Sequence, residues 1–249
     1  MTDLATVTTK VNLPQDDCQI EAYLAKPTAP EIYPGIVVLQ EIFGVNVHIR
    51  DVTERIAKLG YVAIAPALFQ RQAPGFETGY TCKDMEVGRK YAWSQTTASQ
   101  LLSDIQAAIN YLKTLPEINP EKFGCIGFCF GGHVAYPYLA ATLPDIQVTV
   151  SFYGTRITTS TPGGGEPTIT CTKDIQGTIY TFFGIEDASI PQTEVDQIVE
   201  ELEKYNISHR VFRYDGSEHG FFCDRRASYN HKAAAYAWEQ VQQLFSQLI

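Results

Sequence analysis

Short apolar runs recur along the chain, and longer amphipathic stretches separate them. Continuous apolar runs are typical of parallel strands covered on both faces, whereas alternating runs are typical of half-exposed strands. On this basis the sequence predicts strands over Thr6–Val11, Gln19–Ala25, Ile36–Leu39, Tyr61–Ala65, Phe123–Ile126, Val148–Tyr153, Thr178–Phe183 and Ser208–Tyr214.

Between these strands, hydrophobic residues return every three or four positions, which is the spacing of one helical face. Asn46 can cap the first such helix and Gly60 can end it, while Pro116 stops the second. Helices are predicted over 46–59, Thr97–Leu115, Gly131–Ala141, Gln192–Tyr205 and Tyr229–Leu248, with loops over Gln70–Tyr80 and Thr155–Gly177.

Strands that alternate with helices predict an α/β protein whose doubly wound, mainly parallel sheet is flanked by helices in three layers. A chain of 249 residues can bury one large core. The sequence contains no internal repeat and no linker long enough to separate domains, so we expect a single domain over residues 1–249.

Charge and cysteine usage narrow the functional class. A net charge of −9 argues against binding to nucleic acid or to anionic membranes, because both need a basic face. The six cysteines form no C-x-x-C pair, and Met1–Lys10 has no apolar signal-peptide core. No stretch approaches the roughly 20 apolar residues of a membrane span. We therefore expect a reduced, cytoplasmic protein, as a monomer or small homo-oligomer.

The most informative motif is Gly127-Phe128-Cys129-Phe130-Gly131, which lies between a predicted strand and a predicted helix. It matches the nucleophile-elbow pattern G-x-S-x-G with Cys in place of Ser. The turn is so sharp that the nucleophile sits in a strained conformation, and its flanking glycines have no room for side chains. A helix N-terminus after Cys129 would favour the thiolate. The alternative is a buried Cys with glycines used for packing.

Two later loops offer the partners that such a nucleophile needs. Asp187 follows the strand Thr178–Phe183, and His219 follows the strand Ser208–Tyr214. Open α/β sheets assemble their sites at the carboxyl ends of strands, and nucleophile, acid and base come in this chain order in the elbow enzymes. Asp187 would orient His219, and His219 would ionise the thiol. Glu186 could replace Asp187, which could itself be a capping residue, and His219 could be an unpartnered loop residue.

Glu41 and the backbone near it complete the predicted site. Glu41 follows the strand Ile36–Leu39, at the same edge of the sheet. The N–H groups of Ile42 and Phe130 would form an oxyanion hole. The alternative for Glu41 is a surface residue at the end of a strand.

Four stretches resemble the dienelactone hydrolase (carboxymethylenebutenolidase) family: Gln40–Asn46, Gln70–Gly75, Gly127–Gly132 and Glu218–Phe221. The resemblance extends from about residue 20 to the C-terminus. It implies an α/β-hydrolase fold and an enzyme that opens a small carboxylate-bearing lactone or ester through a thioester on the cysteine.

The resemblance also implies roles for individual residues. Cys129 resembles the nucleophile, His219 the base and Asp187 its orienting acid. Glu41 resembles a second carboxylate that contacts the thiol and helps to form the thiolate when substrate arrives.

The same resemblance implies substrate-binding roles for two arginines. Arg71 matches an arginine that binds the substrate carboxylate, a task that suits a planar guanidinium, although a surface Arg is the alternative. A second substrate arginine of the family would stand four residues after His219, where this chain has Cys223. Arg226 lies three residues further on, next to Arg225, and is the candidate replacement.

Neither a metal nor a cofactor is expected. The histidines at 48, 133, 209 and 231 lack the spacing of a metal motif, and no phosphate-binding or dinucleotide-binding glycine pattern occurs. His133 is interpreted as a packing residue. Two other functional classes stay open: a non-catalytic small-molecule binder on the same scaffold, and a thiol redox sensor that pairs Cys129 with Cys223.

Overall fold

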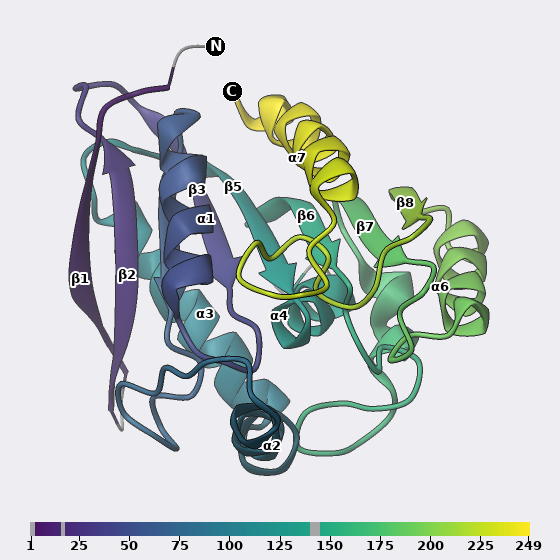
Figure 1. The fold of residues 1–249 in the computed structure, drawn as a ribbon. Coiled ribbons are helices and arrows are strands. Elements are labelled where there is room, and N and C mark those ends of the chain that lie inside the picture. Colours follow the sequence, from purple (N-terminus) through teal and green to yellow (C-terminus); the bar gives the residue numbers. More distant parts are fainter. Residues whose placement is uncertain (1–2, 16–17, 140–144) are drawn as a thin grey trace.

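An eight-stranded sheet in the order β1-β2-β4-β3-β5-β6-β7-β8 forms the centre of the molecule (Figure 1). The structure is a computed structural model that describes residues 3–15, 18–139 and 145–249. The strands are β1 Thr6–Pro14, β2 Gln19–Pro27, β3 Tyr33–Leu39, β4 Val62–Pro66, β5 Ile118–Phe128, β6 Ile146–Phe152, β7 Thr178–Gly184 and β8 Ser208–Tyr214. β2 pairs antiparallel with β1 and β4, and the strands from β4 to β8 pair in parallel. The predicted doubly wound, mainly parallel sheet is confirmed.

The principal helices are α1 Val47–Lys58, α2 Cys82–Lys90, α3 Ala98–Lys113, α4 Phe130–His133, α6 Gln192–Lys204 and α7 His231–Phe245. Asn46 caps α1 as expected, since its side chain accepts a hydrogen bond from the N–H of Ile49. Helix α2 was not predicted. It begins with a reciprocal capping box between Thr81 and Asp84.

Helices cover both faces of the sheet, which gives the three predicted layers. Neighbouring strand residues point to opposite faces, so Val38 packs in the core under α1 and α7, and Val37 packs in the core under α3. Both residues are fully buried, because a parallel sheet between two helical layers leaves neither face to solvent.

The predicted helix Gly131–Ala141 is wrong as a continuous element. Helix α4 ends at His133, and the following helical turn, Val134–Leu139, is broken at Tyr136, where ψ is 151°. Pro137 disfavours the helical conformation of the residue before it, which explains the break. Residues 140–141 lie outside the described residues. The predicted loop Thr155–Gly177 contains a short 3-10 helix, Thr168–Asp174.

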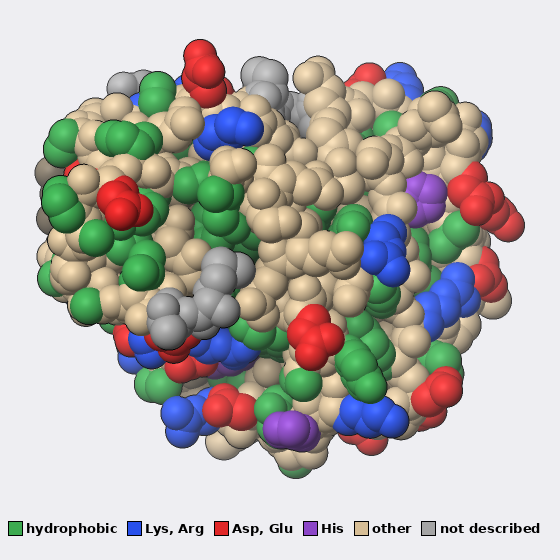
Figure 2. Space-filling view, turned by 90° about the horizontal axis from the view of Figure 1, so that it is seen from above, with side chains coloured by type: hydrophobic (Ala, Val, Ile, Leu, Met, Phe, Trp, Pro, Cys, Tyr) green, Lys and Arg blue, Asp and Glu red, His purple; other side chains and the backbone are tan. Residues whose placement is uncertain are grey.

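The two ends of the sheet differ in the side chains that gather there. Figure 2 looks onto the end near which both termini lie in Figure 1, and acidic and basic side chains are intermingled on it. In the described part of the chain, no helix is long and apolar enough to cross a membrane. The carboxyl ends of the parallel strands lie at the opposite end, and the candidate chemistry gathers there.

Candidate active site

Cys129 sits on a strained turn between β5 and α4. Its φ of 53° and ψ of −111° lie outside the regions that ordinary residues favour. A Cβ on Gly127 would collide with the carbonyl oxygen of Gly131, and a Cβ on Gly131 would collide with that of Leu39. The glycines therefore meet the steric requirement expected of an elbow. Because α4 is only four residues long, it offers Cys129 local N–H groups rather than a long helix dipole.

His219 and Asp187 are hydrogen-bonded to each other. Nδ1 of His219 lies 2.7 Å from Oδ2 of Asp187, and the other carboxylate oxygen accepts the N–H of Ser189 at 2.8 Å. The Asp187 side chain is fully buried. Glu186, the alternative partner, turns away and accepts the N–H of Ser217 at 2.8 Å. The geometry thus pairs His219 with Asp187.

Electrostatics link His219 to the thiol. Burial lowers the pKa of His219, but the charge of Cys129 and hydrogen bonds to Asp187 and Cys129 outweigh burial and raise that pKa to about 10. With Nδ1 engaged by Asp187, the opposite ring nitrogen is left for Cys129. The ring of Tyr153 packs edge-on against His219 with centroids 5.0 Å apart, which restrains the imidazole. The arrangement puts a proton-accepting ring nitrogen beside the thiol of Cys129.

A buried ion pair joins Glu41 to Arg226. Nη1 of Arg226 donates to Oε1 of Glu41 at 3.1 Å, and the two side chains are 16% and 0% exposed. Burial raises the pKa of Glu41, while Arg226 and His219 act to lower it. The guanidinium also lies 5.8 Å from the ring centre of Phe43 and 5.7 Å from that of Tyr80. Arg226 is therefore held inside the site, not on the surface.

The two backbone segments expected to form an oxyanion hole are tied together. Phe130 is the first residue of α4, so its N–H has no acceptor within the helix. The N–H of Gly131 donates to the carbonyl of Gln40 at 3.0 Å. Helix α2 approaches the Ile42 segment so closely that a Cβ on Gly88 would collide with the carbonyl oxygen of Ile42. These contacts fix the backbone around Ile42 beside the elbow.

Arg71 has a different environment. Its guanidinium donates to the buried carboxylate of Asp104 on α3, with Nη2 2.7 Å from Oδ1. The pocket beside His219 has a volume of about 540 Å³, and the described residues that line it include Arg225 and Arg226 but not Arg71. The structure thus brings Arg226 into the site and leaves Arg71 beside α3.

Three residues near the site were missed. Tyr153 is fully buried, has a φ of 38° and directly follows β6, so its place at the carboxyl end of a strand was the available signal. Tyr80 lies in a predicted loop, and its hydroxyl is 3.3 Å from Sγ of Cys223. His48 lies on the buried face of α1, where a single histidine in a helix gives no signal.

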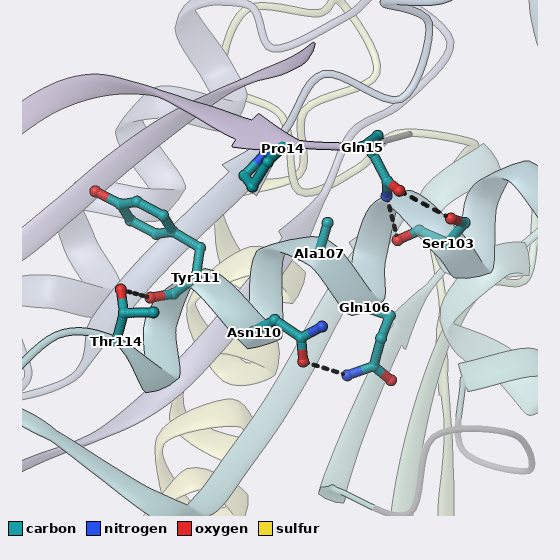
Figure 3. Close-up of a pocket in the computed structure, with 8 residues that line it drawn as sticks. All are labelled: Pro14, Gln15, Ser103, Gln106, Ala107, Asn110, Tyr111 and Thr114. Atoms are coloured by element: carbon teal, nitrogen blue, oxygen red, sulfur yellow. Dashed lines mark hydrogen bonds between the residues drawn. The ribbon is translucent and has the colours of Figure 1, made fainter. Parts of the chain in front are cut away.

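A second groove differs in chemical character from the pocket beside His219. It runs along α3 beside the end of β1 and has a volume of about 380 Å³ (Figure 3). Its polar groups bond to one another, as Gln15 does to Ser103 and Gln106 does to Asn110. None of its described lining residues carries a carboxylate, thiol, imidazole or cationic group. The groove offers only hydroxyl and amide groups, whereas the pocket at His219 is lined by Asp187, His219 and Arg226.

Comparisons with known proteins agree with this geometry. The sequence profile of the dienelactone hydrolase family matches residues 20–249. A protein of Synechocystis assigned as a carboxymethylenebutenolidase is 57% identical over 238 residues, which is 96% of each chain. A Methylorubrum extorquens protein with the same assignment is 31% identical, covering 96% of this chain and 80% of its own.

A solved structure gives the same result. The crystal structure of a protein of Klebsiella pneumoniae assigned as a dienelactone hydrolase superposes with a TM-score of 0.88 at 29% identity. The superposition covers 98% of this chain and 99% of that one.

Proposed function

This chain is a hydrolase of the dienelactone hydrolase family, and we propose that it opens small carboxylate-bearing lactones or esters through a thioester on Cys129. The observation that carries the proposal is the connection from Asp187 through His219 to the strained Cys129. A partly buried His219 whose pKa is raised to about 10 by these partners can hold the proton that the thiol gives up.

Acylation follows from these positions. Sγ of Cys129 attacks the substrate carbonyl, and the oxygen that gains the electron pair receives hydrogen bonds from the N–H groups of Ile42 and Phe130. When the carbon–oxygen bond breaks, the leaving oxygen takes its proton from His219. In a lactone the leaving oxygen stays attached, so the ring opens while the acyl group remains on sulfur.

Deacylation returns the enzyme to its starting state. His219 accepts a proton from water, and the resulting hydroxide attacks the thioester carbonyl. The carbon–sulfur bond breaks, the product leaves as a carboxylic acid, and the thiolate of Cys129 is restored beside the imidazolium. Asp187 keeps the imidazole in one orientation through both steps. The cycle uses the chain's own side chains and water.

Arg226 and Glu41 adapt the site to an anionic substrate. A substrate carboxylate can replace Glu41 as the partner of Arg226, because a guanidinium can form two charge-assisted hydrogen bonds. Glu41 then becomes available to the thiol of Cys129. This makes substrate binding and the reactivity of Cys129 interdependent, and it agrees with the raised pKa of the buried Glu41. Because Arg71 already has a carboxylate partner in Asp104, we assign the substrate carboxylate to Arg226 rather than to Arg71.

The test is hydrolysis of dienelactone and of a simple aryl ester by the purified protein, with Cys129→Ala as the control. We expect the wild type to open dienelactone and the variant to lose both activities. Hydrolysis of the aryl ester alone, lost in the variant, would retain the thioester mechanism and exclude dienelactone as a substrate. Undiminished turnover by Cys129→Ala would refute the proposed mechanism.

A further inference from the structure

Beside the Glu41–Arg226 pair lies a second group of chemically active side chains, Glu41, His48 and Cys223, which we call the rear cluster. A carboxylate oxygen of Glu41, a ring nitrogen of His48 and Sγ of Cys223 lie within 4.8 Å of one another. All three residues are buried, with exposures of 0%, 2% and 0%. They come from the end of β3, the first turn of α1 and the loop before α7.

Two atoms of the rear cluster lack hydrogen-bond partners. Within residues 3–15, 18–139 and 145–249, no group bonds to Oε2 of Glu41 or to Nε2 of His48. His133, a similarly buried histidine, has both ring nitrogens within 2.7 Å of the oxygens of Thr155 and Thr168. A buried polar atom left without a partner costs about 1–3 kcal/mol. The rear cluster therefore has unused binding capacity.

We propose that the rear cluster binds a divalent transition-metal ion of the zinc type through Glu41, His48 and Cys223. A carboxylate, an imidazole and a thiolate together form a donor set that suits Zn²⁺. Zinc bonds of about 2.0–2.3 Å set the ligand atoms of a tetrahedral site roughly 3.3–3.6 Å apart. The three side chains need to close by about one ångström around the ion, and a water molecule would occupy the fourth position.

The charges of the site are compatible with such an ion. Nε2 of His48, to which none of the described residues bonds, offers its lone pair to the ion in the neutral imidazole. Cys223 releases its thiol proton to solvent on binding and exchanges its contact with Tyr80 for the metal. The carboxylate and thiolate supply two negative charges against the two of the ion, and Arg226, which keeps its bond to Oε1 of Glu41, leaves the site with a net charge of +1.

Bound metal would inhibit the enzyme by holding Glu41 away from Cys129. This consequence rests on the proposed function, but metal binding itself does not. Tyr80 and Arg226 line the pocket at His219, so an ion can enter from there. The ligands stand at positions 41, 48 and 223, which explains why no spacing motif indicated the site.

The test must separate the rear cluster from the catalytic pair Cys129 and His219, which can also bind metal. We would strip the full-length Cys129→Ala protein with a chelator, add Co²⁺ and record the thiolate-to-cobalt charge-transfer band. We expect the band in Cys129→Ala and its loss when Cys223→Ser is added. Zn²⁺ affinity is then measured by the displacement of Co²⁺. Adding His48→Phe should lower that affinity by more than the roughly 10–100-fold that loss of an outer-shell partner costs.

Matched controls are Cys82→Ser and His231→Ala in the same background, which remove an exposed thiol and an exposed imidazole. Both should retain the band. Absence of the band in Cys129→Ala, its survival after Cys223→Ser is added, or unchanged Zn²⁺ competition after His48→Phe is added would overturn the proposal. If His48→Phe fails to fold by circular dichroism, His48→Asn replaces it. If Zn²⁺ leaves aryl-ester hydrolysis by the wild type unchanged although Cys129→Ala shows the band, the Glu41 mechanism alone is rejected.

Discussion

The Asp187–His219 pair and the rear cluster satisfy their polar groups very differently. On the catalytic side, both oxygens of Asp187 and the Nδ1 of His219 have hydrogen-bond partners. In the rear cluster, Glu41 and His48 each keep a buried atom to which no residue in the described part of the chain bonds. A fully bonded network holds a single geometry, whereas a partly bonded one retains free energy for binding a further group. The first arrangement suits repeated proton transfer, and the second suits a ligand.

The two histidines show the same contrast in their protonation. The pKa of His219 is raised to about 10 because the charge of Cys129 and a bonded carboxylate outweigh burial. The pKa of His48 is lowered to about 3 because burial and the positive charges of Arg55, Arg226 and Arg225 all act in the same direction. Burial alone thus does not decide the charge of a histidine. Its immediate partners do.

The largest predicted effect is on the catalytic side. His219→Ala removes the group that holds the thiol proton and protonates the leaving oxygen, so we expect kcat/KM to fall on the order of 10⁴-fold or more. Steady-state hydrolysis of an aryl ester measures the loss. A decrease of less than tenfold would show that another base serves Cys129.

Asp187→Asn should fall next in the series. The amide cannot stabilise the imidazolium and favours the wrong tautomer, so kcat should drop by roughly 10³–10⁴-fold. Glu186→Gln is the matched control, because Glu186 bonds to the Ser217 amide and not to His219. The same assay should show a far smaller loss for the control. Equal losses would contradict the assignment of Asp187 as the partner of His219.

The buried ion pair gives the largest predicted effect on stability. Arg226→Leu leaves the carboxylate of Glu41 buried without its cation, which should cost about 3–5 kcal/mol in the free energy of unfolding. Denaturant unfolding measures this loss. The double variant Arg226→Leu/Glu41→Leu should recover much of it, because no buried charge remains. A double variant as unstable as the single one would mean that packing, not charge, explains the loss.

The two histidines predict opposite dependences of stability on pH. Since folding raises the pKa of His219, its stabilising contribution is complete below about pH 6.5 and is lost as pH rises toward 10. Since folding lowers the pKa of His48, its contribution is complete above about pH 6.5 and is lost as pH falls toward 3. Each slope should reach about 1.4 kcal/mol per pH unit.

Unfolding free energies measured across this pH range test both slopes. His48→Phe should flatten the acid limb, the fall of the unfolding free energy below about pH 6.5. His219→Ala should flatten the alkaline limb, the fall above about pH 6.5. An acid limb unchanged by His48→Phe would contradict the assignment of His48 as a buried neutral histidine.

The smallest predicted effect is a gain. His48 packs against the rings of Phe128 and Phe222 while its Nε2 lacks a partner. Phenylalanine keeps the ring contacts and removes the unpaired polar atom, so His48→Phe should stabilise the metal-free protein by about 1 kcal/mol at neutral pH. Thermal unfolding after chelation measures the shift. A clear destabilisation would indicate that the imidazole makes a bond of its own.

Most of the fold and of the candidate site that could be predicted from the sequence followed from local steric rules and from the order of elements along the chain. The elbow at Cys129 could be predicted because its flanking glycines have no room for a Cβ. The pairing of Asp187 with His219 could be predicted because the strands before them end at the same edge of the sheet. Two errors were also local and visible in the sequence. Pro137 indicates a break at Tyr136, and the pair Thr81 and Asp84 indicates the N-terminal cap of α2.

Pairings between distant residues could not be predicted in this way. Arg226 reaches Glu41 across 185 positions, and Arg71 meets Asp104 instead of lining the pocket. The rear cluster likewise forms only when β3, α1 and the loop before α7 come together. Such contacts depend on side-chain packing in three dimensions, about which hydrophobic periodicity carries no information.

The most direct test of the central claim is the capture of the acyl-enzyme. The protein is mixed with an activated aryl ester, quenched in acid during the first turnovers and analysed by intact mass and peptide mass spectrometry. We predict a mass increase equal to the acyl group, located on the peptide that contains Cys129 and discharged by hydroxylamine. Turnover with the acyl group on another residue, or with Cys129 unmodified at every quench time, would contradict the account.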